Sequence, residues 1–209
     1  MPDNKSRMER VASNTSSRSH LDELLDKALA ETFPASDPIA IEFDRPQPAA
    51  NERRSMMKSR LDYWKVSPQG FAALRHLNDY VEGCGLERSL LELVKTRASQ
   101  INGCAYCLDM HTKDARAAGE SEQRLYTLSA WRETPFFSER ERAALAWTEA
   151  ITKISEHPIE DALYTELQQY FSEKEIVDLT LAIITINGWN RLAIPFRTPA
   201  GSYKPRASG

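Results

Sequence analysis

The chain has 209 residues, of which 41% are hydrophobic and 27% are charged, and its formal net charge is −3 at pH 7. This balance is ordinary for a folded domain, and the slight negative charge argues against nucleic acid or an anionic membrane as a partner. No apolar run approaches the roughly 20 residues that a membrane-spanning helix needs. The N-terminus lacks the apolar segment of a secretion signal, so we expect a cytoplasmic protein.

Residues 1–50 are expected to form an N-terminal extension made of a short helix and a proline-rich linker. Residues 1–20 are rich in Ser, Asn and Arg and offer little to bury. Apolar residues then recur at helical spacing from Leu21 to Leu29, and four prolines follow between Pro34 and Pro48. Such an extension is either loosely ordered or a docking element.

Residues 51–209 are expected to form one all-α domain of helical hairpins, because their apolar residues recur at helical rather than strand spacing. The expected helices cover about residues 68–82, 87–101, 104–118, 122–131, 139–154 and 173–189, with a shorter one after Pro158. Local capping signals mark three helix starts: Ser67 with Pro68, Ser138 with Glu141, and Ser172 with Glu175. The tail after Arg197 is rich in Gly, Ser, Pro and Lys, and we expect it to be loose.

The most informative stretch holds Cys104, Cys107 and His111 at the start of an expected helix, directly after an Asn-Gly turn. On a helix the two cysteines share a face, with a Cα separation of roughly 5–5.5 Å that a disulfide tolerates. The helix start favours a thiolate, and the imidazole one turn further on offers a proton acceptor. This pattern predicts an activated cysteine with a resolving cysteine one turn away.

Other roles are known for a Cys-x-x-Cys pair. Haem attachment needs a His directly after the second cysteine, where Leu108 stands, and a thioredoxin-like site needs a preceding strand, whereas this flank is helical. Zinc held by both cysteines, His111 and a carboxylate would crowd three ligands into eight residues of one helix. Zinc binding, as in a helical binding protein without catalysis, and a purely structural role for the cysteines therefore stay open as alternatives.

The run from Leu90 to Arg116, LLELVKTRASQINGCAYCLDMHTKDAR, resembles the core of the AhpD-like alkylhydroperoxidases of the carboxymuconolactone decarboxylase superfamily. The family pattern is a Glu, eleven residues, Cys-x-x-Cys, three residues and a His. Glu92, Cys104, Cys107 and His111 match this spacing throughout. The segment INGWNRLAI at 186–194 is similar to the C-terminal core helix of the family, and the resemblance covers about residues 55–205.

The resemblance implies a helical core that assembles into trimers or hexamers and reduces organic hydroperoxides as part of antioxidant defence. By analogy Cys107 would be the peroxidatic thiolate and Cys104 the resolving thiol, while Glu92 and His111 would form a proton relay. No bound cofactor is implied, but an external dithiol is, such as a lipoyl-bearing or thioredoxin-like protein. One position departs from some family members, because Tyr106 stands where they carry a second His.

Two points follow from the residues themselves. Helix-terminus electrostatics favour Cys104 as the more acidic thiol, but Cys107 is closer to His111, and we expect Cys107 to attack. Glu92 lies among apolar neighbours, so burial is expected to raise its pKa; alternatively it faces solvent or pairs with Lys95 or Arg88. A disulfide reductase or redox sensor on the same fold is the alternative function.

Overall fold

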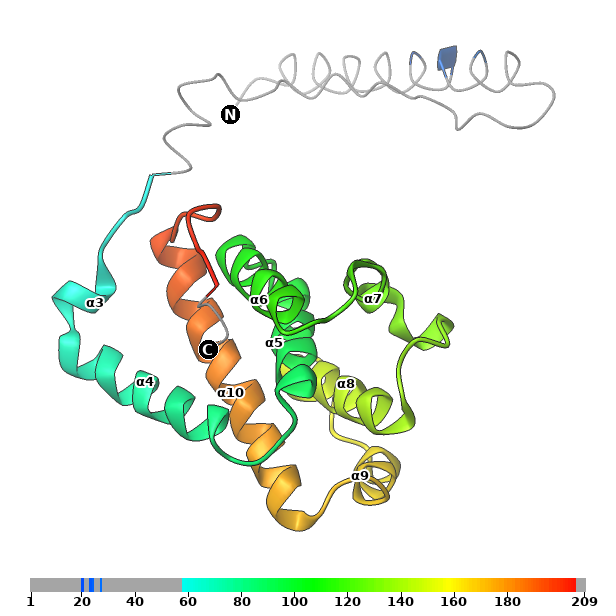
Figure 1. The fold of residues 1–209 in the computed structure, drawn as a ribbon. Helices are drawn as coiled ribbons and strands as arrows, with labels where there is room; N and C mark the ends of the chain where they lie inside the picture. Colours follow the sequence, from blue (N-terminus) through cyan, green and yellow to red (C-terminus); the bar gives the residue numbers. More distant parts are fainter. Residues whose placement is uncertain (1–19, 21–22, 25–26, 28–57, 206–209) are drawn as a thin grey trace, which may run out of the picture. The chain divides into compact units, whose positions relative to one another are not determined.

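The computed structural model describes residues 20, 23, 24, 27 and 58–205 (Figure 1). The chain divides into two compact units, Met1–Ala49 and Ala50–Gly209. In the first unit the four described residues are helical and exposed. The rest of the short helix expected there, and the whole proline-rich linker, lie outside the described residues.

The described part of the second unit is helical, and no strand occurs between residues 58 and 205. The all-α fold class is therefore confirmed. Its helices are α3 (Tyr63–Val66), α4 (Pro68–Glu82), α5 (Arg88–Asn102), α6 (Ala105–Ala117), α7 (Glu122–Thr127), the 3-10 helix η1 (Leu128–Glu133), α8 (Glu139–Thr152), α9 (Asp161–Gln168) and α10 (Glu173–Phe196). Among these residues, no helix combines the length and apolar character that crossing a membrane requires.

Helix α5 lies at the centre of this unit, packed against α6, α8 and α10 (Figure 1). Its neighbours cover it so completely that even polar residues on it, among them Glu92, Lys95 and Ser99, are buried. Helix α10 packs in turn against α4, α5 and α8. A side chain on α5 is therefore held by several elements at once, which makes this helix a rigid base for a site.

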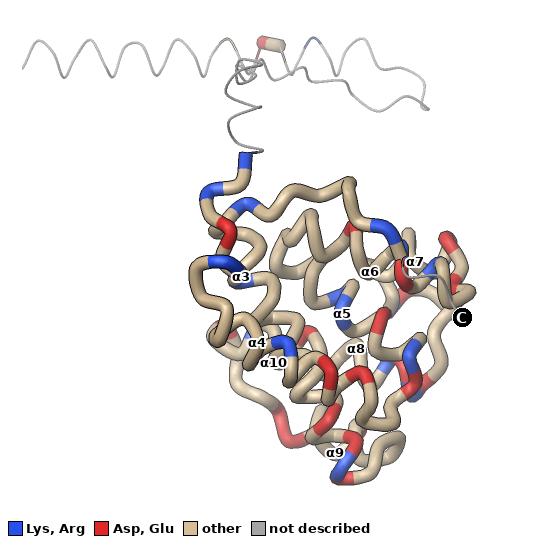
Figure 2. The backbone as a smooth tube through the Cα atoms, turned by 60° about the vertical axis from the view of Figure 1, so that its left-hand side comes forward, with Lys and Arg blue, Asp and Glu red and all other residues tan. Residues whose placement is uncertain are grey.

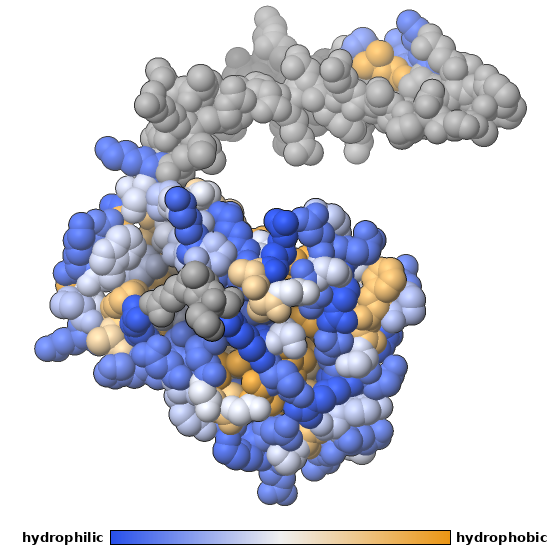
Figure 3. Space-filling model, in the orientation of Figure 1, coloured by the Kyte–Doolittle hydropathy of each residue, from blue (hydrophilic) through white to orange (hydrophobic). Residues whose placement is uncertain are grey.

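Across residues 58–205, three apolar clusters make up the core. The largest joins α4, α5, α8, α9 and α10, and a second gathers around Trp131 and Phe137. The third is small and contains Cys104 and Cys107 together with Ala98, Ile186 and Ala193. The cysteine pair is thus enclosed between α5, α6 and α10 rather than displayed on the surface. On the face shown in Figure 3, apolar residues appear in patches between hydrophilic ones.

The N-termini of the helices test the capping signals that the sequence contains. Both expected capping boxes are confirmed. The side chains of Ser138 and Ser172 accept hydrogen bonds from the backbone N–H groups of Glu141 and Glu175, and the carboxylates of these glutamates accept from the backbone N–H groups of the serines. Ser67 precedes α4 as expected, but its side chain makes no capping bond. Acidic and basic residues are interspersed along the described helices (Figure 2).

Two expected helices end differently in the structure. The helix expected over 122–131 changes to a 3-10 helix at Leu128. Helix α10 continues to Phe196, well beyond the expected end at Trp189, because Asn190 and Ala193 on its last turns are buried against the rest of the unit. This extension brings the C-terminal end of α10 next to the cysteine cluster.

Candidate active site

The cysteine pair spans the start of α6. Gly103 ends α5 in the left-handed conformation, with φ of 70°, and Cys104 follows as the N-cap residue of α6. The Cys104 sulfur accepts a hydrogen bond from the backbone N of Cys107 at 3.3 Å. The two sulfurs are joined in a disulfide with a Cα separation of 5.4 Å, inside the expected range. The other cysteine, Cys84, is free.

A buried amide network that sequence reasoning missed holds this turn against α10. The side-chain Nδ2 of Asn102 donates to Asn187 at 2.9 Å and to Asn190 at 2.8 Å. Asn190, which is fully buried, donates in turn to the hydroxyl of Ser99 at 3.2 Å. Because Asn102 and Gly103 lead directly into Cys104, the network fixes where the cysteine pair begins. The asparagines of INGWN were the available signal.

Glu92 of α5 and His111 of α6 meet directly in the interior. Nδ1 of His111 lies 2.9 Å from Oε2 of Glu92, and both residues are buried. An ionised carboxylate can only accept a hydrogen bond, so Nδ1 carries the proton in this pair. When the imidazole is neutral, its lone pair therefore lies on Nε2, which is buried without a hydrogen-bond partner among the described residues.

The surroundings of Glu92 correct one expectation. Burial raises its pKa, but the hydrogen bond from His111 and the charges of His111 and Lys95 outweigh burial, so the pKa lies below its ordinary value. Lys95 Nζ lies 3.3 Å from Glu92 and also binds Glu82. The raised pKa expected from apolar neighbours is therefore wrong, and so is the solvent-facing alternative; the pairing with Lys95 is present.

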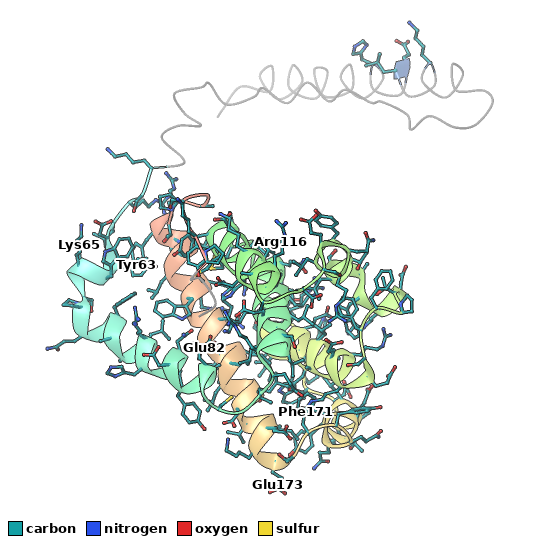
Figure 4. All side chains as sticks on the ribbon, in the orientation of Figure 1. Tyr63, Lys65, Glu82, Arg116, Phe171 and Glu173 are labelled. Atoms are coloured by element: carbon teal, nitrogen blue, oxygen red, sulfur yellow. A yellow bond between two sulfur atoms is a disulfide. The ribbon has the colours of Figure 1, made fainter. Side chains whose placement is uncertain are left out.

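A cavity of about 770 Å³ opens onto these residues. Glu92, Cys107 and His111 line it, whereas Cys104 does not. Its wall is rich in aromatic side chains: Tyr63, Trp64, Phe71, Tyr106, Trp189 and Tyr203. Figure 4 marks Tyr63 on α3 and Glu82 at the end of α4, two of the contributors from outside the α5–α6 pair. Trp189 thus forms part of the wall of the cysteine pocket.

The C-terminal segment 198–205 also belongs to this site, although it was expected to be loose. The Tyr203 hydroxyl donates to the carboxylate of Asp114, 2.8 Å from each oxygen. Lys113 Nζ donates to the Tyr203 carbonyl at 3.1 Å, and the Gly201 amide to Asp109 at 3.0 Å. These three bonds tie the segment to α6. No local sequence signal links residues about ninety positions apart.

One cluster of the described residues has the spacing of metal ligands. Ligand atoms of Glu92, His111 and Asp114 lie within 4.8 Å of one another. Each is already engaged, however: Glu92 with His111 and Lys95, and Asp114 with Tyr203. The buried Lys95 ammonium, 3.3 Å from Glu92, already offsets the charge of that carboxylate. We assign no metal to this cluster.

Known proteins resemble this chain in sequence. The model of the carboxymuconolactone decarboxylase family matches residues 68–150. The uncharacterized protein YdfG of Bacillus subtilis is 42% identical over 146 residues, which are 70% of this chain and 99% of YdfG. The uncharacterized protein YnjA of Escherichia coli is 31% identical over 98 residues, 47% of this chain and 53% of YnjA.

Solved structures resemble it as well. A protein of unknown function from Agrobacterium tumefaciens, described as a putative antioxidant defence protein AhpD, has a TM-score of 0.68 and 46% identity. The match covers 70% of this chain and all of that one. The debrominase Bmp8 has a TM-score of 0.60 over 66% of this chain and 74% of its own, but at 19% identity it shows the shared fold alone.

Proposed function

The chain belongs to the AhpD-like carboxymuconolactone decarboxylase family, and on that premise we propose that it is a thiol-dependent peroxidase that reduces organic hydroperoxides through Cys104 and Cys107. One observation carries the proposal. Cys107 shares a cavity with the His111–Glu92 pair, while Cys104, which does not line the cavity, is joined to Cys107 in a disulfide. The aromatic wall of the cavity suits the organic part of a hydroperoxide.

The cycle has three steps in this proposal. The Cys107 thiolate attacks one peroxide oxygen, the O–O bond breaks, and an alcohol leaves while Cys107 becomes a sulfenic acid. The Cys104 thiol then attacks this sulfur, forming the disulfide and releasing water. An external dithiol reduces the disulfide by thiol–disulfide exchange and is itself oxidised. The joined sulfurs of Cys104 and Cys107 correspond to the oxidised enzyme of this cycle.

His111 and Glu92 supply the proton transfers. Cys107 and His111 are separated by one turn of α6, and both line the cavity, so the Nε2 lone pair is available to take the thiol proton. Glu92 fixes the tautomer and stabilises the imidazolium that forms. The same imidazolium then returns the proton to the departing alkoxide. Cys104 acts as the resolving thiol because, unlike Cys107, it does not line the cavity.

The remaining parts of the proposal follow from the family. The reductant is a dithiol of the lipoyl or thioredoxin type, and the enzyme works as a homo-oligomer. No bound cofactor takes part, because the electrons come from the external dithiol. A redox sensor would form the same disulfide without sustained turnover, so the test must follow both events.

The test is a thiol titration of the reduced chain before and after one equivalent of cumene hydroperoxide. The proposal expects two thiols to disappear, mapped by mass spectrometry to Cys104 and Cys107, and Cys84 to stay free. Turnover with excess dithiol is then measured for Cys107→Ser, with Cys84→Ser as the matched control. Full turnover by Cys107→Ser, or unchanged thiols, would overturn the proposal. Disulfide formation without turnover would favour the sensor.

A further inference from the structure

We propose that Tyr203 is a positioning residue of this site: by binding the Asp114 carboxylate, it keeps that carboxylate from competing with Glu92 and Cys107 for His111. This inference rests on the proposed function and adds a residue from the C-terminal segment to it. The geometry that carries it is a chain of contacts running from the segment 198–205 through α6 to α5.

Asp114 is close enough to His111 to compete with Glu92 for a hydrogen bond to the imidazole. It follows His111 by three residues on α6, so the two side chains share a helical face. One of its oxygens lies within 4.8 Å of ligand atoms of both His111 and Glu92. A second carboxylate at this range can replace Glu92 as the acceptor for the imidazole, or take the N–H of an imidazolium at Nε2.

Either of these contacts of Asp114 would prevent His111 from acting as the base for Cys107. With an acceptor on each nitrogen, the imidazole is held as a cation and offers no lone pair to Cys107. Loss of Glu92 as the acceptor would turn the ring away from the geometry in which Nε2 is open. In the structure neither occurs: Nδ1 faces Glu92, and Nε2 is buried without a partner.

Tyr203 is suited to holding Asp114. Its hydroxyl lies 2.8 Å from both carboxylate oxygens, so it engages the whole group rather than one end. Burial raises the pKa of Tyr203, and the bond to Asp114 raises it further, so the phenol stays a donor across the working pH range. The bond from Lys113 to the Tyr203 carbonyl fixes the backbone behind the ring.

The other groups around His111 do not take over this role. Lys95 is bound to Glu82 and Glu92, and α10 contributes Trp189 and Ala193, which do not titrate. The remaining charged or titratable groups on the cavity wall are Arg75 and Asp79 from α4, Arg88 from α5, Tyr63 from α3 and Tyr106 from α6. Among the described residues, Tyr203 alone binds the Asp114 side chain.

The experiment compares Tyr203→Phe, Asp114→Ala and the double variant in a full-length background where Cys84 and Cys104 are Ser. Cys107 is then the single thiol, and its alkylation by iodoacetamide is followed against pH. We expect Tyr203→Phe to lower the alkylation rate about tenfold at pH 7 and to move the profile up by about one pH unit, toward an unassisted cysteine. Asp114→Ala and the double variant should behave like the parent, because the competitor is gone.

The control is Tyr126→Phe, since Tyr126 makes the same kind of bond, to Glu122 at 2.8 Å, on the exposed surface of α7. If Tyr203 and Asp114 served only to anchor the C-terminal segment, both single variants would be impaired and the double would not recover; this would overturn the proposal. An unshifted profile in a folded Tyr203→Phe protein would do so too. Alkylation needs no peroxide, so absent turnover in the otherwise native protein would count against the peroxidase alone.

Discussion

His111 on α6 and Glu92 on α5 are joined by a 2.9 Å contact in the interior of the protein, 19 residues apart in the chain. The contact orients an imidazole toward the cavity that Cys107 lines. Because α5 is covered by α6, α8 and α10, Glu92 has little freedom to move. The His111 imidazole that is bonded to Glu92 is therefore held in place as well. The geometry on which the proposed proton transfers depend is thus part of the core.

Replacing Glu92 by Gln should lower kcat/KM for an organic hydroperoxide by about 10- to 100-fold. The neutral amide cannot stabilise the imidazolium, and the buried Lys95 keeps only Glu82 as a carboxylate partner. Steady-state turnover with a dithiol reductant measures the change. Glu156→Gln removes an exposed carboxylate paired with Lys153 at 3.6 Å and should leave kcat/KM unchanged. Equal rates for both variants would show that Glu92 takes no part.

Gly103 should tolerate Asn much better than Val. Its φ of 70° is one that residues with a side chain adopt at a cost of about 1–2 kcal/mol, and Asn tolerates it best. A Cβ there would meet nothing within 4 Å, so backbone strain decides the outcome rather than a clash. Chemical denaturation should show Gly103→Val losing about 2 kcal/mol of unfolding free energy and Gly103→Asn less than about 1 kcal/mol. Similar losses in both would point to a packing effect instead.

Much of the helical framework could be predicted from the chain because its signals are local. The capping boxes at Ser138 and Ser172 involve residues three positions apart, and both form as expected. The end of α10 could not be predicted in this way. Trp189 looked like the last helical residue, but burial of Asn190 and Ala193 against distant elements carries the helix on to Phe196.

In the candidate site, too, features set by local spacing could be predicted and features set by long-range contacts could not. Spacing placed Cys104, Cys107 and His111 on one helical stripe, because one helix sets those distances. The sequence predicted a raised pKa for Glu92, whereas the pKa is lowered in the structure. The direction of the shift depends on how closely His111 and Lys95 approach Glu92 in the fold. The bond from Tyr203 to Asp114 was invisible, since it spans 89 residues and its segment looked like a loose tail.

Asn190→Ala should destabilise the protein by about 2–3 kcal/mol. Asn190 is fully buried, and its loss leaves Asn102 and Ser99 each without one hydrogen-bond partner. Thermal unfolding of the reduced protein gives the comparison without the disulfide constraint. Arg191→Ala, the next residue on α10, removes an exposed side chain whose hydrogen bonds within the described part of the chain go to Asn187, and it should stay within about 0.5 kcal/mol of the parent. If both variants unfold alike, the amide network adds no stability.

Glu175 should stabilise α10 in a pH-dependent way. Bonds to the backbone of Ser172, then to Arg140 and the Ser172 hydroxyl, lower the pKa of Glu175 from 4.5 to about 2. A depressed pKa means that the stabilisation is full above about pH 4.5 and is lost as the pH falls toward 2. Because the side chain is about one-third exposed, solvent screening limits the effect, and Glu175→Ala should lose about 1 kcal/mol at pH 7.

The matched variant is Glu173→Ala, which removes a carboxylate from the same first turn of α10 but leaves the capping box intact. Urea denaturation at pH 7, 4 and 2.5 should show the gap between Glu175→Ala and the parent narrowing steadily with acidity, while the Glu173→Ala gap stays small throughout. A gap for Glu175→Ala that is constant with pH would mean that the ionised carboxylate contributes nothing beyond its packing.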